Sequence, residues 1–131
     1  MQDFGYALGR ALLSVIFLVS GFTKLMDVTA IGRTLGNAGF PQPRYFGYAV
    51  AAAELIGGAM LLLGFRARWV ALALFLFTAG TIVIAHAFWT MEGAARAANQ
   101  VQALKNLAIM GGLLLVGSVG SGRLSLDGRR G

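Results

Sequence analysis

The sequence contains no cysteine and only two prolines in 131 residues. The absence of cysteine excludes disulfide bonds, thiolate metal sites and dithiol redox chemistry. Charged residues are also scarce: they make up 12% of the chain, against about 25% in an ordinary soluble domain, while hydrophobic residues make up 57%. Because a small water-soluble globule needs many polar side chains to cover its surface, this composition excludes a soluble monomer. It also excludes intrinsic disorder, which requires low hydrophobicity and high charge.

The charged residues that are present separate long apolar stretches, which is the pattern of a multi-pass membrane protein. An α-helix needs about 20 residues to cross a hydrocarbon layer of ~30 Å. Four stretches approach or reach that length, and we predict membrane-spanning helices at about residues 7–26, 45–65, 69–89 and 102–119. Strands are excluded because the apolar runs are continuous and lack the alternating polarity of a barrel strand.

The first of these stretches is the shortest, because its uncharged core, residues 11–23, covers only 13 residues. As a span it requires Arg10 and Lys24 to extend toward the interface, or Lys24 to enter the bundle. A secretory signal peptide and an interfacial helix are the alternatives. We expect a span, since no A-x-A-like cleavage site follows and residues 12–22 are apolar on all sides.

The chain is therefore predicted to be one all-α domain over residues 1–131, a four-helix transmembrane bundle. The first loop is the longest, and residues 27–35 are suited to a short helix at the membrane surface. Residues 93–102, before the fourth span, also have a helical composition. The Gly- and Ser-rich tail, residues 120–131, shows no packing pattern, and we expect it to be weakly ordered.

Eleven Lys and Arg residues against five acids give the chain a net charge of +6. Most of the basic residues lie at the ends of the predicted spans, so we interpret them as topology markers and expect no nucleic-acid partner. With the N-terminus inside, six basic residues lie on the cytoplasmic side and five on the other side. When Lys24 and Lys105 are set aside as span-end residues, the five become three. This bias predicts cytoplasmic termini.

Glu54 is the one acidic residue within a predicted span, and it lies near the middle of the membrane. A charged group at that depth costs roughly 2.5–3.5 kcal/mol on insertion, so its presence requires an explanation. One explanation is structural: a neutral or paired carboxyl that ties helices together. The other is functional, a proton-handling or ligand-binding group, and we favour it because ionisable residues at this depth are usually functional.

Five other polar residues of the spans lie on the outer side of Glu54 when the termini are inside. They are Lys24, His86, Gln102, Lys105 and Asn106. We predict one polar pocket that opens toward the outer face and binds a ligand through these six residues, with Lys24 neutralising Glu54. One histidine and one glutamate are too few for a metal site.

Each of these residues also has a structural interpretation. His86 can be an interfacial residue beside the aromatic pair at 88–89, and Lys105 can extend its ammonium to the interface. Asn106 is suited to an interhelical hydrogen bond. On the second span, Ala49, Ala53 and Gly57 repeat every four residues, and we predict that they form a helix contact face, although chance spacing in a Gly- and Ala-rich chain is the alternative.

Short motifs along nearly the whole chain resemble those of the DoxX family of small bacterial membrane proteins. They are GR at 9–10, IFL at 16–18, SGFTKL at 20–25, GFP at 39–41, ELIGG at 54–58, LGFRAR at 63–68, His86, FW at 88–89, KNLA at 105–108, GG at 111–112 and GRLSLD at 122–127. Each motif is short, and their order and spacing make the match specific. Ala85 precedes His86 where relatives often have phenylalanine.

The resemblance implies a four-helix bundle in the bacterial cytoplasmic membrane. It also implies, for some members, a link to quinone-dependent oxidation of sulfur compounds or to membrane oxidoreductase assemblies. The family's motif positions fall on five residues of the predicted pocket: Lys24, Glu54, His86, Lys105 and Asn106.

Three functions agree with these observations. The first is a redox-associated subunit whose pocket accepts a quinone-like ring, with Glu54 exchanging a proton and electrons coming from a partner oxidoreductase, since no intrinsic cofactor motif is evident. The second is a non-catalytic scaffold in a membrane complex or a homo-oligomer. The third, a small proton-coupled permease, ranks last because no inverted repeat or proline-broken span is present. Whether the protein is an enzyme stays open.

Overall fold

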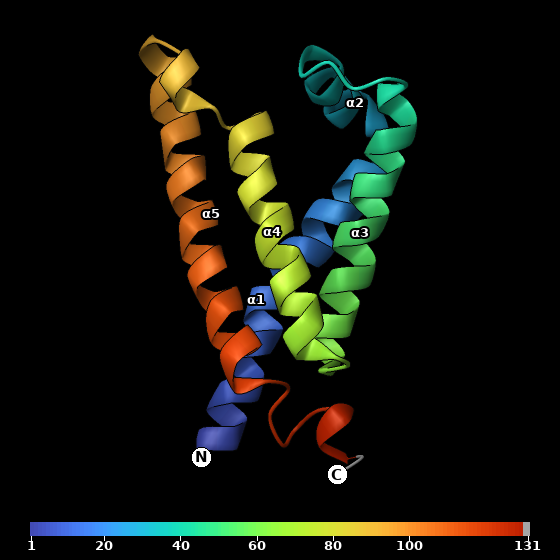
Figure 1. Ribbon diagram of the computed structural model, residues 1–131, viewed down its shortest axis with the longest axis vertical. Helices are drawn as coiled ribbons and strands as arrows, with labels where there is room; N and C mark the ends of the chain where they lie inside the picture. Colours follow the sequence, from blue (N-terminus) through green and yellow to red (C-terminus); the bar gives the residue numbers. More distant parts are fainter. Residues whose placement is uncertain (130–131) are drawn as a thin grey trace.

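The computed structural model describes residues 1–129, all of whose regular structure is helical (Figure 1). The elements are α1 (Gln2–Met26), α2 (Val28–Asn37), α3 (Pro43–Leu63), α4 (Ala67–Ala85), η1 (Phe88–Thr90), α5 (Gly93–Val119) and η2 (Asp127–Arg129). Helices α1, α3, α4 and α5 are long and apolar enough to cross a membrane, α4 being extended through η1. The predicted all-α fold with four candidate spans is confirmed.

The four long helices form two pairs that meet at one end and separate at the other (Figure 1). Helix α1 packs along α3, and α4 packs along α5. The N-terminus and the end of the described chain, at residue 129, lie where the pairs meet, which we call the terminal end. At the opposite end, which we call the α2 end, α2 covers the top of the α1–α3 pair and η1 follows α4.

The short helix expected in the first loop is present as α2. Its first turn is capped by Asp27, whose side chain accepts a hydrogen bond from the Thr29 amide at 3.0 Å. Val28 and Leu35 are buried against the rest of the protein, and α2 packs on the start of α3. This helix therefore closes the α2 end of the α1–α3 pair.

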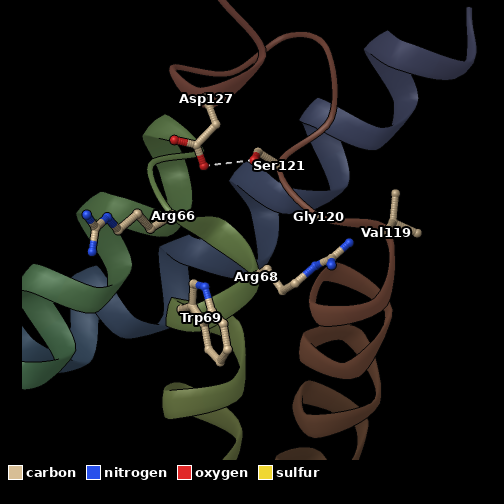
Figure 2. A pocket seen from close by; sticks show the side chains of 7 residues that line it. All are labelled: Arg66, Arg68, Trp69, Val119, Gly120, Ser121 and Asp127. Carbon is tan, nitrogen blue, oxygen red and sulfur yellow. Dashed lines mark hydrogen bonds between the residues drawn. The ribbon is translucent and has the colours of Figure 1, made fainter. Parts of the chain in front are cut away.

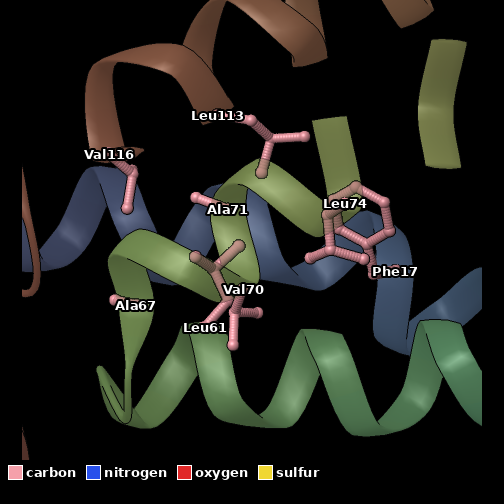
Figure 3. Close-up of a cluster of buried hydrophobic side chains, with 8 residues drawn as sticks. All are labelled: Phe17, Leu61, Ala67, Val70, Ala71, Leu74, Leu113 and Val116. Atoms are coloured by element: carbon pink, nitrogen blue, oxygen red, sulfur yellow. The ribbon is translucent and has the colours of Figure 1, made fainter. Parts of the chain in front are cut away.

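The apolar core lies toward the terminal end, where all four long helices meet (Figure 3). Its buried members are Phe17, Leu61, Ala67, Val70, Ala71, Leu74, Leu113 and Val116. Many other large apolar side chains point outward, such as Leu12, Val83 and Leu115, which is the arrangement expected where lipid replaces water. Because the core packs the terminal end, the two helix pairs can separate at the α2 end of the bundle.

The contact face of α3 differs from the predicted one. Ala49 and Ala53 are exposed, and only Gly57 of the predicted stripe is in contact, against the side chain of Leu74. The buried positions are Gly47, Ala51, Glu54, Gly58 and Leu61. Because α3 carries small residues on several faces, spacing alone does not show which face packs. The face of α3 that packs is the one that carries the buried Glu54.

The tail also differs from the expectation of weak order, because residues 120–129 fold back under the terminal end. The buried guanidinium of Arg10 donates to the carbonyl oxygens of Leu124 at 2.9 Å and Ser121, and the Leu126 amide donates to Leu63 at 3.0 Å. Arg10 is only 4% exposed, so it does not extend to the interface as predicted. Residues 130–131 of the predicted tail lie outside the described residues.

Candidate functional site

A cavity of about 720 Å³ lies between the two helix pairs at the α2 end. All six predicted pocket residues line it: Lys24, Glu54, His86, Gln102, Lys105 and Asn106. The remaining lining is largely apolar and includes Phe40, Phe46 and Phe77. The structure therefore brings the predicted polar cluster together around one space.

Lys24 and Glu54 form an ion pair between α1 and α3 on one wall of the cavity. The Lys24 Nζ lies 3.0 Å from Oε1 and 2.9 Å from Oε2 of Glu54, and it also donates to the hydroxyl of Ser20. The side chain of Glu54 is 6% exposed and that of Lys24 25%. The prediction that Lys24 neutralises Glu54 is confirmed.

The absence of a side chain at Gly21 lets α1 and α3 approach closely enough for this pair. A Cβ atom at Gly21 would lie 2.9 Å from the Ala51 carbonyl oxygen and from Leu55. Because α1 and α3 run antiparallel, Lys24 lies one turn toward the α2 end from this contact, and its side chain reaches back past Ser20 to Glu54. A small residue in α1 thereby positions a charged pair in the membrane-spanning region.

Asn106 and Thr81 link α4 and α5 on the opposite wall. The Asn106 Nδ2 donates to the Thr81 hydroxyl at 3.1 Å, and that hydroxyl donates to the Thr78 carbonyl oxygen at 2.8 Å. This confirms the interhelical hydrogen bond expected of Asn106, which also lines the cavity. Thr78 and Thr81 were not predicted, because isolated threonines in an apolar run are common and carry no spacing signal.

His86 ends α4 and is half-buried at the mouth of the cavity. Its Nδ1 lies 3.0 Å from the Asn99 Oδ1 on α5. When this oxygen accepts, Nδ1 carries the proton and Nε2 is left as an acceptor. Sequence reasoning missed Asn99, although its spacing of three from Gln102 and seven from Asn106 places all three on one helical face.

Gln102 and Lys105 are exposed and line the cavity without a partner of their own. Within residues 1–129, neither side chain makes a hydrogen bond or an ion pair. Lys105 is thus the unpaired cation of the cavity lining, since Lys24 is held by Glu54. These two side chains are unpartnered donors that are available to a ligand.

The acidic and histidine side chains of the described residues form no group of three that could hold a metal ion.

Phe40 and Phe46 pack edge to face, with ring centroids 5.3 Å apart, where the first loop meets α3. This aromatic pair closes the cavity near α2. No sequence pattern pointed to it, because its two members come from a loop and a helix start that only the folded chain brings together.

Comparisons with known proteins agree with this architecture. The DoxX family model matches residues 5–87, and the SURF4 family model matches residues 47–131. Inner membrane protein YphA of Escherichia coli (strain K12) is 32% identical over 133 aligned positions, which cover 97% of this chain and 95% of that protein. Inner membrane protein YqjF of the same organism is 32% identical over 130, with coverages of 97% and 92%.

A third relative is CatD of Bacillus subtilis (strain 168), whose name provisionally calls it an oxidoreductase. It is 31% identical over 81 aligned positions, which cover 62% of this chain and 59% of that protein. No solved structure matches the chain. The family match over more than half of the chain, the full-length inner membrane relatives and the four candidate spans together show that the chain is a multi-pass inner membrane protein of the DoxX family.

Proposed function

We propose that this protein is a redox-associated membrane subunit whose cavity binds a quinone-like ring. The observation that carries the proposal is the cavity between the helix pairs. It combines an apolar and aromatic lining with two unpartnered donors, Gln102 and Lys105, opposite the buried Lys24–Glu54 pair. The provisional oxidoreductase name of the relative CatD supports the redox association.

The residues present fit such a ring. The volume of about 720 Å³ lies within the range of small-molecule pockets, about 300–1,000 Å³. Ring carbonyl oxygens need donors, and the ammonium of Lys105 and the amide of Gln102 supply them without breaking an existing hydrogen bond. Phe77 and Ile109 offer flat and aliphatic surfaces beside these donors.

The chain's own residues would bind and orient the ring and manage its protons. A bound quinone supplies the two-electron chemistry, and a partner oxidoreductase supplies or removes the electrons. Lys105 and Gln102 would hold the ring oxygens, while the Lys24–Glu54 pair, reached from the same cavity, would hold or release a proton. The apolar lining keeps water from the ring and strengthens these polar contacts.

Ligand binding tests the proposal directly. The protein is purified in mild detergent, extracted for bound quinone, and titrated with a short-chain ubiquinone and a menaquinone analogue. Lys105→Met should weaken binding about tenfold to a hundredfold, the value of one charge-assisted hydrogen bond. Arg96→Met is the matched control, because Arg96 is an exposed cation on α5 that does not line the cavity. Absence of extracted quinone together with no binding of either analogue would overturn the proposal.

A non-catalytic scaffold is the second candidate, and the ion pair itself favours it. Lys24 and Glu54 satisfy each other within the protein, as a purely structural pair would. Glu54→Gln separates the two functions. A scaffold should still co-purify with its partner and support the cell, whereas the redox subunit should stay folded and lose its function.

We also propose that both termini are cytoplasmic, so that the cavity lies in the outer half of the membrane. Arg10 no longer counts as a topology marker, because it is buried and bonded to the tail. With Arg10 set aside like Lys24 and Lys105, the sequence places five basic residues on the same side of the spans as the termini and three on the other side. The basic turn at residues 66–68 supports this orientation.

A further inference from the structure

We propose that a second pocket, at the terminal end, binds the phosphate headgroup of an anionic phospholipid. This pocket has a volume of about 470 Å³ and lies where α3, α4, α5 and the folded tail meet (Figure 2). It is lined by Arg66, Arg68, Trp69, Val119, Gly120, Ser121 and Asp127. It is separate from the cavity of the proposed function, with which it shares no lining residue.

The charge of this pocket is not balanced within the protein. In the part of the chain that the structure describes, the ion pairs are Lys24–Glu54 and Arg123–Asp3, so Arg66 and Arg68 have no carboxylate partner. Asp127 is the one acid in the lining, and it already interacts electrostatically with the buried Arg10 and accepts from the Ser121 hydroxyl at 2.9 Å. The two arginines are left to attract an external anion.

The two guanidinium groups point in opposite directions (Figure 2). Arg68 extends toward the end of α5, where its Nη2 donates to the Ser118 carbonyl oxygen at 3.3 Å and its other N–H groups stay available. Arg66 extends the other way and lies over the ring of Phe65, 5.9 Å from its centroid. In this view Trp69 lies between the two side chains, with Arg68 directed toward α5 and the Arg66 guanidinium directed away from the rest of the lining.

Among the described residues, Arg66 and Gln42 are the two non-glycine residues with a positive φ. Arg66 has φ 47° and ψ 35°, in the left-handed region that glycine adopts with less strain. Glycine stands two residues earlier, at Gly64, where the chain also turns with a positive φ of 66°. The substitution Arg66→Gly therefore removes the guanidinium without adding backbone strain.

A lipid is favoured over a soluble anion because the pocket continues into a lipid-facing surface. Trp69 is 71% exposed at the end of a candidate span, the position where tryptophan lies among headgroups. Leu72 and Leu76 follow it at spacings of three and four on the same face of α4; both are exposed, and Leu76 also borders the cavity at the α2 end. An acyl chain below the headgroup would lie along these side chains. Basic pockets of this kind between helices hold anionic headgroups in other membrane proteins.

Tryptophan quenching by brominated lipids measures this directly, because the chain has two tryptophans, Trp69 near the start of the candidate span Ala67–Thr90 and Trp89 near its end. Trp89→Phe leaves Trp69 as the reporter. The variant is reconstituted in phosphatidylcholine vesicles that contain an equal fraction of acyl-brominated phosphatidylglycerol or acyl-brominated phosphatidylcholine. The brominated phosphatidylglycerol should quench Trp69 more strongly. In the reciprocal Trp69→Phe background, Trp89 should show no such difference.

The arginines are then tested in the Trp89→Phe background. Arg66→Gly with Arg68→Gln should reduce the preference for phosphatidylglycerol about tenfold or more. Glycine suits the left-handed turn, so this variant should have a melting temperature equal to or above that of the wild-type protein. Arg33→Gln with Arg44→Gln removes the same charge at the α2 end and should leave the preference intact. Arg68→Lys, which keeps the charge, should retain most of it.

Three results would overturn the proposal. One is equal quenching of Trp69 by the two brominated lipids. Another is a preference that persists in the Arg66→Gly, Arg68→Gln variant, which would leave these arginines as topology markers only. The third is displacement of phosphatidylglycerol by millimolar inorganic phosphate, which would assign the pocket to a soluble anion.

Discussion

The ammonium of Lys24 on α1 lies 2.9 Å and 3.0 Å from the two carboxylate oxygens of Glu54 on α3. The pair is asymmetric, because the Glu54 side chain is 6% exposed and the Lys24 side chain 25%. The carboxylate therefore depends on its partner more than the ammonium does. The pair also lines the cavity, so the same contact holds two helices together and presents a titratable group to any ligand.

Removing either member of this pair should have unequal effects. Lys24→Met leaves an uncompensated buried carboxylate, and we expect a loss of about 3–5 kcal/mol in the free energy of unfolding. Glu54→Gln leaves the more exposed ammonium, which can turn toward the interface, so the loss should be smaller, about 1–2 kcal/mol. The measurement is thermal or denaturant unfolding in detergent. The double variant Lys24→Met, Glu54→Gln should recover part of the Lys24→Met loss, and additive losses would contradict direct coupling.

Arg10 should determine whether the tail is held in place. Arg10→Met removes the donor to Leu124 and Ser121, and we expect a loss of about 2–4 kcal/mol together with faster cleavage of the tail by added protease. Arg10→Lys should not restore protection, because a single ammonium lacks the planar fork that reaches several carbonyl groups. Arg123→Gln is the control. Its side chain is 87% exposed and lies 3.9 Å from Asp3, so a loss above about 1 kcal/mol there would be unexpected.

Gly21 should tolerate no larger side chain. Gly21→Val places atoms against the Ala51 carbonyl oxygen and Leu55, and we expect a loss of about 1–3 kcal/mol in the free energy of unfolding. It should also separate Lys24 from Glu54. Gly111→Ala is the matched control, since a Cβ atom there would meet nothing within 4 Å, and alanine should stabilise the helix by about 0.5–1 kcal/mol. Equal effects at the two positions would argue against close α1–α3 packing.

Reporter fusions test the proposed orientation. A reporter that is active only in the cytoplasm, inserted in the turn at residues 66–68, should be active, and one inserted in the loop at residues 38–42 should be inactive. The physical reason is the excess of arginine at the terminal end. The reverse pattern would place the cavity in the inner half and require the proposed headgroup site to select lipids of the outer leaflet.

Much of the site followed from one-dimensional reasoning about depth. Because each span advances about 1.5 Å per residue, the polar residues at positions 24, 54, 86, 102, 105 and 106 were expected on one side of the membrane, and all six line one cavity. The same reasoning missed Asn99 and the threonines of α4, whose partners are identified only by contact. It also chose the wrong small residues as the contact face of α3, where the helix repeat leaves several faces open.

The sequence alone determined the class of this protein, because scarce charge and span-length apolar runs admit helices in a membrane and little else. It also determined the depth of Glu54, which follows from counting residues. Only the tertiary structure decided which faces meet, since packing depends on side-chain shape at close approach, as at Gly21. It decided the place of Arg10 as well: the carbonyl groups that bind this guanidinium come from the tail, more than 100 residues away along the chain. Such a contact has no local signal in the sequence.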